Sequence, residues 1–427
     1  FRAIAKSRKV SILESHGFTA EGTLPEGVEL PDSLKNKPMD YIQIDPVAVM
    51  QENSIAWNPT LAEFKEGESA EPEHGYHPRS KTRRAERLLV TDEEREEVLK
   101  RYVKNVNKMT DRDPRTWILH PWKVERYAGE IVNIFVDGDL VPEQAETRVS
   151  GGRTGPRTER AVIKHIDIRI EMDNGNRFNI TSTDLDDAYQ MLLACLLENG
   201  LTKNYFHFFI DGEKVLREAI HKYFKPWHYK IFLDFYHVEE KIQNLLSLAL
   251  ISKRVESPWD EREYYVIGPK KGELKDPKYT SLSVTYVTVC TSIIWYGNVD
   301  EAIEYIRRIR QDHIKNRAKL DELIQYFDTR REMLTCYALR RRSGLKNSSN
   351  ASELVNELLI SARQKVDDRM HWRPDGSSSL AAVTALKLNQ GLDKWFKAHE
   401  FSFKMYQVAP TEFRKSTVSD IEDIEIA

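Results

Sequence analysis

Three acidic residues lie far apart in the chain, each where a carboxylate is unexpected. Asp137 and Asp211 each follow directly on an apolar run typical of a buried strand, and Glu353 opens a predicted helix after a polar turn. A carboxylate at the end of a buried strand is costly unless other groups compensate its charge. Three converging carboxylates would suit two hard divalent cations, Mg²⁺ or Mn²⁺. The three acids therefore predict metal-dependent phosphoryl transfer on nucleic acid.

The two aspartates share a local pattern, because Gly138 and Gly212 follow them. A glycine lets backbone or substrate approach closely. On neighbouring strands the two carboxylates can share a cation, which removes the repulsion between them. Asp139 is a second candidate for the first position, since residues two apart on a strand point the same way. We prefer Asp137 because it repeats the context of Asp211; the alternative is that each aspartate only caps the turn after it.

The composition is that of a globular protein with local rather than global positive charge. The 427 residues are 40% hydrophobic and 31% charged, with a net charge of −3. This length predicts two or three domains. Because no basic field covers the whole chain, contacts to nucleic acid must come from patches such as Arg340, Arg341 and Arg342. A solvated basic surface is the alternative interpretation of such a patch.

The cysteines and the hydropathy favour an intracellular protein. Cys195, Cys290 and Cys336 are too few and too scattered for a disulfide framework or a zinc site, and the first two lie in apolar surroundings typical of a core. The most apolar long stretch, 281–296, is too short to span a bilayer. We therefore expect a protein of the reducing cytoplasm that does not enter a membrane.

From about residue 130 the hydrophobic pattern predicts an α/β domain. Apolar residues over 166–172 alternate with Asp167, Arg169 and Glu171, which is typical of a half-buried strand. Asn174-Gly175 indicates a hairpin turn. The expected elements are strands over 131–136, 166–172, 177–181, 205–210 and 229–233, and helices over 184–198 (capped by Ser182 or Thr183), over 213–224, from 238, and over 300–310.

Three antiparallel strands followed by alternating helices and strands predict a ribonuclease H-like mixed sheet. A helical insertion before Glu353 and a separate, mixed or mostly helical N-terminal region complete the expected architecture. The expected parts are 1–128, an N-terminal region for binding DNA ends with a charged helix over 92–107; 129–250, the first part of the catalytic core; 251–335, the helical insertion; 336–400, the second part of the core; and 401–427, an acidic tail.

The segment after the fifth predicted strand resembles part of a known family. Asp234 and His237 form an Asp-x-x-His element that resembles the one following the second catalytic aspartate in Mutator-type and related insertion-sequence transposases. The resemblance implies that His237 supports the active site, with Asp234 as a secondary candidate. The alternative is that Asp234 caps a helix and His237 lies in its first turn.

The C-terminal part resembles bacterial DDE transposases more specifically. Glu353 follows a polar turn, Arg363 and Lys365 lie ten and twelve residues beyond it (363 − 353 = 10; 365 − 353 = 12), and Trp372 belongs to a Met-His-Trp element. The resemblance implies that Arg363, Lys365 and Trp372 contact DNA. Glu357, about one helical turn later, is the rival to Glu353.

The resemblance covers residues 130–390 and implies a DNA transposase with hAT-like and Mutator-like relatives. Such an enzyme would act at the bacterial nucleoid, binding the terminal inverted repeats of its element as a homodimer or larger assembly. It would hydrolyse a phosphodiester to free a 3′-hydroxyl and join that hydroxyl to target DNA. The alternatives are a catalytically inactive DNA-binding protein that keeps the fold, and a ribonuclease H-fold nuclease without strand transfer.

Overall fold

A computed structural model gives the fold of the chain, which divides into two compact units. The first unit comprises 1–39, 129–232 and 348–427, and the second comprises 40–128 and 233–347. The structure describes residues 2–37, 40–44, 122–126, 131–144, 162–172, 174–251, 254–256, 283–295, 297–337, 340, 345–347, 357–365 and 370–407.

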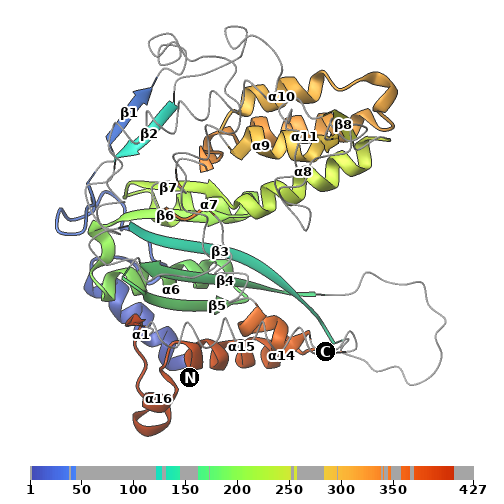
Figure 1. The fold of residues 1–427 in the computed structure, drawn as a ribbon. Coiled ribbons are helices and arrows are strands. Elements are labelled where there is room, and N and C mark those ends of the chain that lie inside the picture. The colour runs from blue at the N-terminus through green and yellow to red at the C-terminus, as the bar shows by residue number, and fades with distance from the viewer. Residues whose placement is uncertain are drawn as a thin grey trace, which may run out of the picture. The chain divides into compact units, whose positions relative to one another are not determined.

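A six-stranded mixed sheet forms the centre of the first unit (Figure 1). The pairs β10–β5, β5–β4 and β4–β3 are antiparallel, whereas β3 and β6 pair in parallel. The predicted α/β class is confirmed, and the strands lie in the order β10 (Tyr406–Gln407), β5 (Asn176–Ser182), β4 (Val162–Met172), β3 (Ile131–Pro142), β6 (Tyr205–Ile210) and β7 (Tyr229–Leu233).

The hairpin between β4 and β5 turns at the predicted glycine. Gly175 has φ +90°, a conformation that side chains strain to adopt. Its N–H donates to the carbonyl of Met172, and Asn174 Oδ1 accepts from the N–H of Asn176. The turn therefore fixes the register of β4 against β5, as the sequence predicted.

Strand β3 is longer than the predicted strand over 131–136. It continues through Asp137 to Pro142 and stays paired with β4 over this whole length. The apolar run stops at Asp137, but the backbone ladder does not depend on the side chains and continues. Asp137 therefore lies within β3, not after its end.

Helices cover both faces of this sheet. Residues of β3, β4, β5 and β6 with even numbers form one face and those with odd numbers the other, since directly paired residues point the same way. The Phe208–Phe224 and Tyr189–Tyr223 ring contacts place α7 and α6 on the even-numbered face, and His165–Ser377 places α15 on the odd-numbered one. The helical elements of this unit are α1 (Arg2–Ser15), α6 (Leu185–Glu198), η2 (Leu201–Lys203), α7 (Lys214–Phe224), η6 (Glu357–Ser361), α14 (Ala362–Gln364), α15 (Pro374–Leu388) and α16 (Leu392–Ala398).

The cap of α6 differs from the prediction. Asp184, rather than Ser182 or Thr183, accepts a hydrogen bond from the N–H of Asp187 through its side chain. Ser182 instead donates to the Asp187 carboxylate. An aspartate both caps the helix and places a negative charge at its positive end, which explains why it takes the position.

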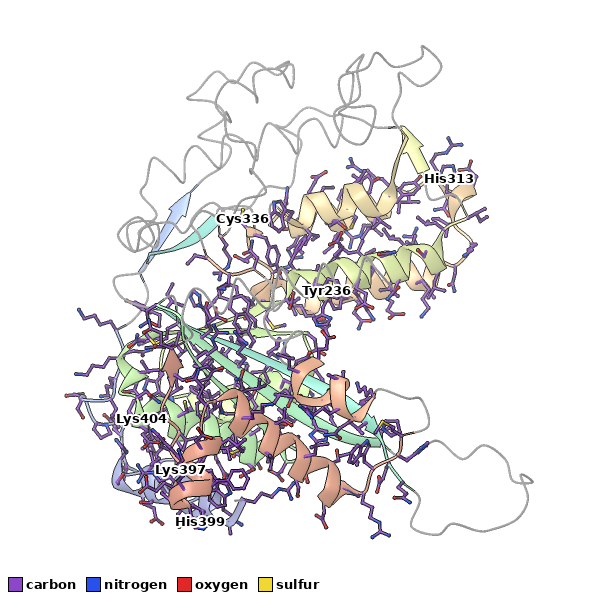
Figure 2. All side chains as sticks on the ribbon, turned by 60° about the horizontal axis from the view of Figure 1, so that its bottom comes forward. Tyr236, His313, Cys336, Lys397, His399 and Lys404 are labelled. Carbon is purple, nitrogen blue, oxygen red and sulfur yellow. The ribbon has the colours of Figure 1, made fainter. Side chains whose placement is uncertain are left out.

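Among the residues that the structure describes, the second unit contains four α-helices and two short 3₁₀ turns. At the start of the second of these helices, the hydroxyl of Tyr286, the first residue of α9 (Tyr286–Trp295), lies 2.7 Å from Nδ1 of His313, which Figure 2 labels. The helix expected over 92–107 lies outside the described residues. The elements are β1 (Asp40–Ile44), β2 (Trp122–Arg126), α8 (Phe235–Ala249), β8 (Arg254–Glu256), β9 (Ser283–Thr285), α9 (Tyr286–Trp295), α10 (Val299–Arg307), η4 (Gln311–His313), α11 (Arg317–Thr329) and η5 (Arg331–Met333).

Cys195 and Cys290 are fully buried, as the sequence predicted. Within the described part of the chain, none of the helices combines the length and the apolar character needed to cross a membrane.

Candidate functional site

The register of the sheet brings Asp137 and Asp211 to the same edge. Phe135 of β3 pairs with Phe209 of β6, and their rings stack with centroids 4.9 Å apart. Two residues further along both strands, Asp137 lies level with Asp211, which follows the last residue of β6. Asp211 also caps the turn before α7, because its Oδ1 accepts from the N–H of Glu213 at 2.8 Å. The capping role considered from the sequence is therefore present at Asp211.

A third aspartate, Asp167, lies beside Asp137 and was not predicted as a site residue. The two are direct partners in the β3–β4 ladder, so their side chains lie on the same, odd-numbered face. Asp167 is 1% exposed, and neither carboxylate oxygen makes a hydrogen bond. Burial raises the pKa of Asp167 to about 7, the charges of Asp139 and Asp137 raise it further, and the hydroxyl of Thr181 opposes the rise.

The alternating sequence pattern predicted that Asp167 lies on the solvent face of a half-buried strand, and this prediction is wrong. His165 and Arg169 are buried as well, so both faces of β4 are covered. The alternation of apolar and polar residues indicated an exposed face only because nothing in the sequence showed that α15 covers it. A buried carboxylate next to Asp137 and Asp139 would have marked Asp167 as a candidate site residue. Its position next to them becomes visible only when the register of β3 against β4 is known.

Asp139 is held by the C-terminal segment. Lys365 forms an ion pair with its Oδ1, and the Ser361 hydroxyl lies 3.4 Å from its Oδ2. The segment itself is fixed by apolar packing of η6 and α15 against the far ends of β3 and β4, where Val141, Ile163, Leu359, Ile360, Ala381 and Ala385 form one buried cluster. Lys365 therefore has a carboxylate partner, and the phosphate contact predicted for it stays a prediction.

His165 belongs to a buried hydrogen-bond chain between β4 and α15. Its Nε2 lies 2.7 Å from Ser377 Oγ, which donates to Gln364 Oε1 at 2.5 Å. An amide oxygen can only accept, so the Ser377 hydroxyl gives its hydrogen to Gln364 and accepts one from Nε2. Burial lowers the pKa of His165 to about 4, with Arg2 and Lys365 lowering it and Asp139 opposing them. His165 is therefore neutral, with its proton on Nε2.

The two glycines that follow the aspartates serve different purposes. Gly212 has φ +92°, which other residues rarely adopt. Gly138 instead makes room for the side chain of Lys164, because a Cβ at residue 138 would lie only 2.9 Å from Cε of that lysine. Lys164 crosses at this point to form an ion pair with Glu213 at 2.6 Å. The common glycine thus reflects two local constraints rather than the one shared purpose that the sequence indicated.

Asp234 and His237 lie at the start of α8 in the second unit. Asp234 is buried and caps the helix by accepting from the N–H of Tyr236 at 2.9 Å. Nδ1 of His237 lies 3.8 Å from the Glu240 carboxylate. The capping alternative for Asp234 is therefore confirmed, and catalytic support by His237 stays a prediction.

The described DNA-binding candidates differ in exposure. Arg340 is 2% exposed and donates from Nε and Nη2 to the carbonyl of Lys346, so it holds a turn together. Trp372 packs against the cluster of η6 and α15, and its indole donates to the carbonyl of Gln364. Arg363 is exposed. Of the three, Arg363 is the one whose side chain could meet a phosphate without rearrangement.

Several predicted residues complete the account of the C-terminal segment. Glu357 is exposed and is the first residue of η6. Glu353, Arg341 and Arg342 lie outside the described residues. Among the residues that the structure describes, no three histidine, cysteine, aspartate or glutamate side chains are placed to hold a metal ion. Asp137 and Asp211 are two of the three predicted ligands, and the third, Glu353, belongs to the part not described.

Comparison with models of known protein families and with curated proteins gives no match for this chain.

Proposed function

We propose that the protein is a DNA transposase with a ribonuclease H-like core. The proposal rests above all on the parallel β3–β6 register, which brings Asp137 and Asp211 level at one edge of the sheet. The strand order β5-β4-β3-β6-β7 also supports it, because that order is the one expected for a ribonuclease H-like sheet. The acids and their positions carry the proposal, since one fold can host many activities.

The chain's own residues would bind and orient the phosphodiester. The proposed cofactors are two Mg²⁺ or Mn²⁺ ions held by Asp137, Asp211 and Glu353, which would neutralise charge at the scissile phosphate. Asp167, buried beside Asp137 without a hydrogen bond, makes this edge more negative when it is ionised. The exposed Arg363 would contact the DNA backbone, and double-stranded DNA with the terminal repeats would be the partner.

The test is cleavage of a labelled duplex that carries the terminal repeats flanking the gene, against a scrambled duplex, in Mg²⁺, Mn²⁺ or EDTA. We expect metal-dependent nicking at the repeat boundary that is lost in Asp137→Asn and Asp211→Asn. Asp393→Asn is the matched control, because Asp393 is an exposed acid of α16. Calorimetric titration with Mn²⁺ gives a second readout, since both site variants should bind the ion more weakly than the control.

The other outcomes point to the alternative functions. Binding of the repeats without cutting under every metal condition would favour a catalytically inactive DNA-binding protein. Cutting that ignores the repeats would favour a nuclease without strand transfer. Cleavage that survives both aspartate substitutions would remove these residues from the site.

A further inference from the structure

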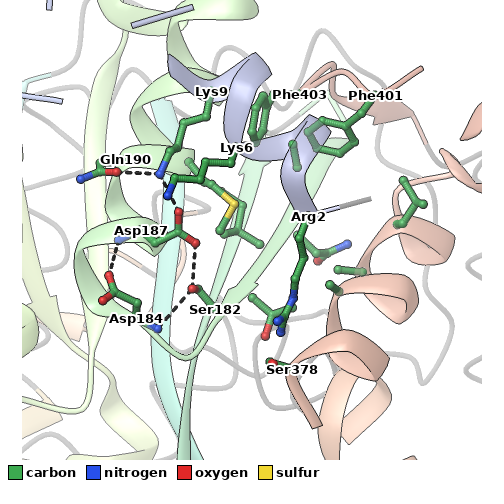
Figure 3. A pocket seen from close by; sticks show the side chains of 18 of the residues that line it. Arg2, Lys6, Lys9, Ser182, Asp184, Asp187, Gln190, Ser378, Phe401 and Phe403 are labelled. Carbon is green, nitrogen blue, oxygen red and sulfur yellow. Dashed lines mark hydrogen bonds and ion pairs between the residues drawn. The ribbon is translucent and has the colours of Figure 1, made fainter. Parts of the chain in front are cut away.

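A cavity of about 510 Å³ lies along β5 in the first unit (Figure 3). Helix α1 and the start of α6 form one side, α15 forms another, and the segment around Phe401 and Phe403 closes one end. The volume is within the range of about 300–1,000 Å³ that is common for sites of small organic ligands. Asp137 and Asp211, the described residues of the proposed metal site, do not line it.

Three cationic side chains of α1, Arg2, Lys6 and Lys9, line this cavity, and among the described residues only Lys9 has a counter-charge. Nζ of Lys9 bonds Asp187 at 2.5 Å and Gln190 at 2.6 Å, so its charge is compensated. Arg2 extends from α1 toward Ser378 on the opposite wall (Figure 3). Among the described residues Arg2 makes neither an ion pair nor a hydrogen bond, although its charge acts on His165. An anionic group of a ligand would find its partner at Arg2, with Lys6 as a second cation on the same helix.

The first unused acceptor in the cavity is Nδ1 of His165. This side chain is fully buried and lines the cavity. Its Nε2 carries the proton given to Ser377, so Nδ1 holds a lone pair, and it has no hydrogen-bond partner. A buried acceptor without a partner is costly, and a donor on a ligand would remove that cost.

Two more unused acceptors lie next to it on β5. Asn179 is 2% exposed, and its amide nitrogen donates to Asn389 and to the Tyr406 hydroxyl, which leaves Oδ1 without a partner. Oγ1 of Thr181 is also buried and accepts no hydrogen bond, while its hydroxyl lowers the pKa of the neighbouring Asp167. Both residues line the cavity. With His165, three buried acceptors without a hydrogen-bond partner therefore line the same cavity.

The end of the cavity is aromatic. Phe401 and Phe403 contact each other with ring centroids 4.8 Å apart, and Phe178 lies 5.9 Å from Phe403. This segment is held in place by Asn199, whose Nδ2 donates to the carbonyl of Phe403 and whose Oδ1 accepts from the N–H of Met405. Aromatic walls of this kind suit a flat ring.

We propose that this cavity binds a nucleoside monophosphate whose base carries an amino group. The base would lie against Phe401 and Phe403, and the two N–H bonds of its amino group would donate to two of the three acceptors on Thr181, Asn179 and His165, while the phosphate would pair with Arg2. A flat ring with an amino group and a separate anionic group matches the aromatic, acceptor and cationic parts of the cavity. The proposal does not depend on the transposase activity, since it uses other residues and another ligand.

The test is isothermal titration of the full 427-residue chain with AMP, CMP, UMP, adenosine and ribose 5-phosphate. We expect AMP or CMP to bind more tightly than UMP, which lacks an amino group, and more tightly than adenosine or ribose 5-phosphate. Arg2→Gln should weaken AMP binding about 10- to 100-fold, as for a lost charge-assisted hydrogen bond. It should leave adenosine binding unchanged.

Thr181→Val removes one acceptor with little change in shape and should weaken AMP about 3- to 10-fold while sparing ribose 5-phosphate. Lys397→Gln, on α16 and outside the cavity lining (Figure 2), is the matched control and should change nothing. Absence of nucleotide binding to the folded chain at millimolar concentration would overturn the proposal. Equal AMP affinity in Arg2→Gln, Thr181→Val and the control would overturn it as well.

Discussion

The two faces of the central sheet are both buried, but the odd-numbered face carries buried polar and ionisable side chains beside its apolar ones. The even-numbered face carries Ile134, Ile168 and Phe208, which pack under α6 and α7. The odd-numbered face places His165 and Asp167 under cover with polar atoms that lack partners. Both faces therefore contribute stability through apolar burial, but only the odd-numbered face also carries buried polar atoms without partners, which are unfavourable for folding and make it the candidate face for binding or chemistry.

The difference is sharpest at two consecutive residues of β4. Ile168 is fully buried among aliphatic and aromatic groups, and Asp167 is buried on the other side of the same strand. Both positions exclude water, but only the second holds an ionisable group. Burial alone therefore does not identify a core residue, because the chemistry of the buried atoms separates a stabilising position such as Ile168 from a candidate functional one such as Asp167.

The largest effect on stability is expected when an acidic side chain is introduced on the even-numbered face. Ile168→Asp would bury an uncompensated carboxylate in an apolar layer and remove an isoleucine that is 0% exposed. We expect the free energy of unfolding to fall by about 4 kcal/mol or more, enough to prevent folding. Urea denaturation would measure it, with Ile168→Val as the control expected to cost about 1 kcal/mol. A cost of the aspartate variant no larger than that of the control would contradict the contrast between the faces.

The reverse change, Asp167→Asn, should stabilise the protein in a pH-dependent way. The pKa of Asp167 is about 7 in the folded chain against an ordinary 3.8, so the folded state holds the extra proton between these values. Its contribution to the free energy of unfolding therefore decreases as pH rises from about 4 to 7. At 1.36 kcal/mol per pKa unit, the variant should gain up to about 4 kcal/mol at pH 8 and nothing near pH 4.

The measurement is the free energy of unfolding of wild type and Asp167→Asn as a function of pH, with Asp393→Asn as an exposed control. His165 contributes the opposite slope, because its pKa of about 4 lies below the ordinary 6.5, and both variants keep it. The difference between wild type and Asp167→Asn therefore isolates the carboxylate. If the difference in the free energy of unfolding did not change with pH, the pKa of Asp167 would be the same in the folded and unfolded chain, which would contradict its raised pKa.

A smaller effect separates one ion pair on each face. Lys365 binds Asp139 on the odd-numbered face, where the aspartate side chain is 14% exposed, whereas both partners of Lys164–Glu213 are more than a third exposed. Lys365→Met should cost about 2 kcal/mol because it leaves a poorly solvated carboxylate. Lys164→Met should cost less than about 1 kcal/mol, as for exposed pairs. If urea titrations gave the same loss of unfolding free energy for Lys365→Met and Lys164→Met, the carboxylates of Asp139 and Glu213 would be equally well solvated, which would contradict this prediction.

Much of the fold could be predicted from local sequence patterns. The apolar runs gave β6 and β7 their bounds, and Asn174-Gly175 located the hairpin turn, because each depends on residues close together in the chain. The extension of β3 beyond residue 136 could not be predicted in this way. It depends on pairing with β4 across a long connection, and the three residues 137–139 interrupt the apolar signal while the backbone ladder continues.

The candidate site was only partly predictable for the same reason. Asp137 and Asp211 were identified because each ends an apolar run, a local signal. Asp167 and His165 were missed because their surroundings are set by β3 and α15, which lie far from them in sequence. The buried position of Arg340 was likewise hidden, since a run of three arginines indicates exposure unless the turn that encloses the first of them is known.

The smallest predicted effects distinguish the two glycines that looked equivalent in sequence. Gly212→Ala forces a side chain into the left-handed region, φ +92°, and should cost about 1 kcal/mol. Gly138→Ala only displaces the end of the flexible Lys164 side chain, so it should cost about 0.5 kcal/mol or less, by weakening an exposed ion pair. Combining Gly138→Ala with Lys164→Met isolates the cause, because the alanine should then cost nothing further. An equal cost of the alanine in both backgrounds would mean that Gly138, too, is required by the backbone of β3, and that the two Asp-Gly pairs are alike after all.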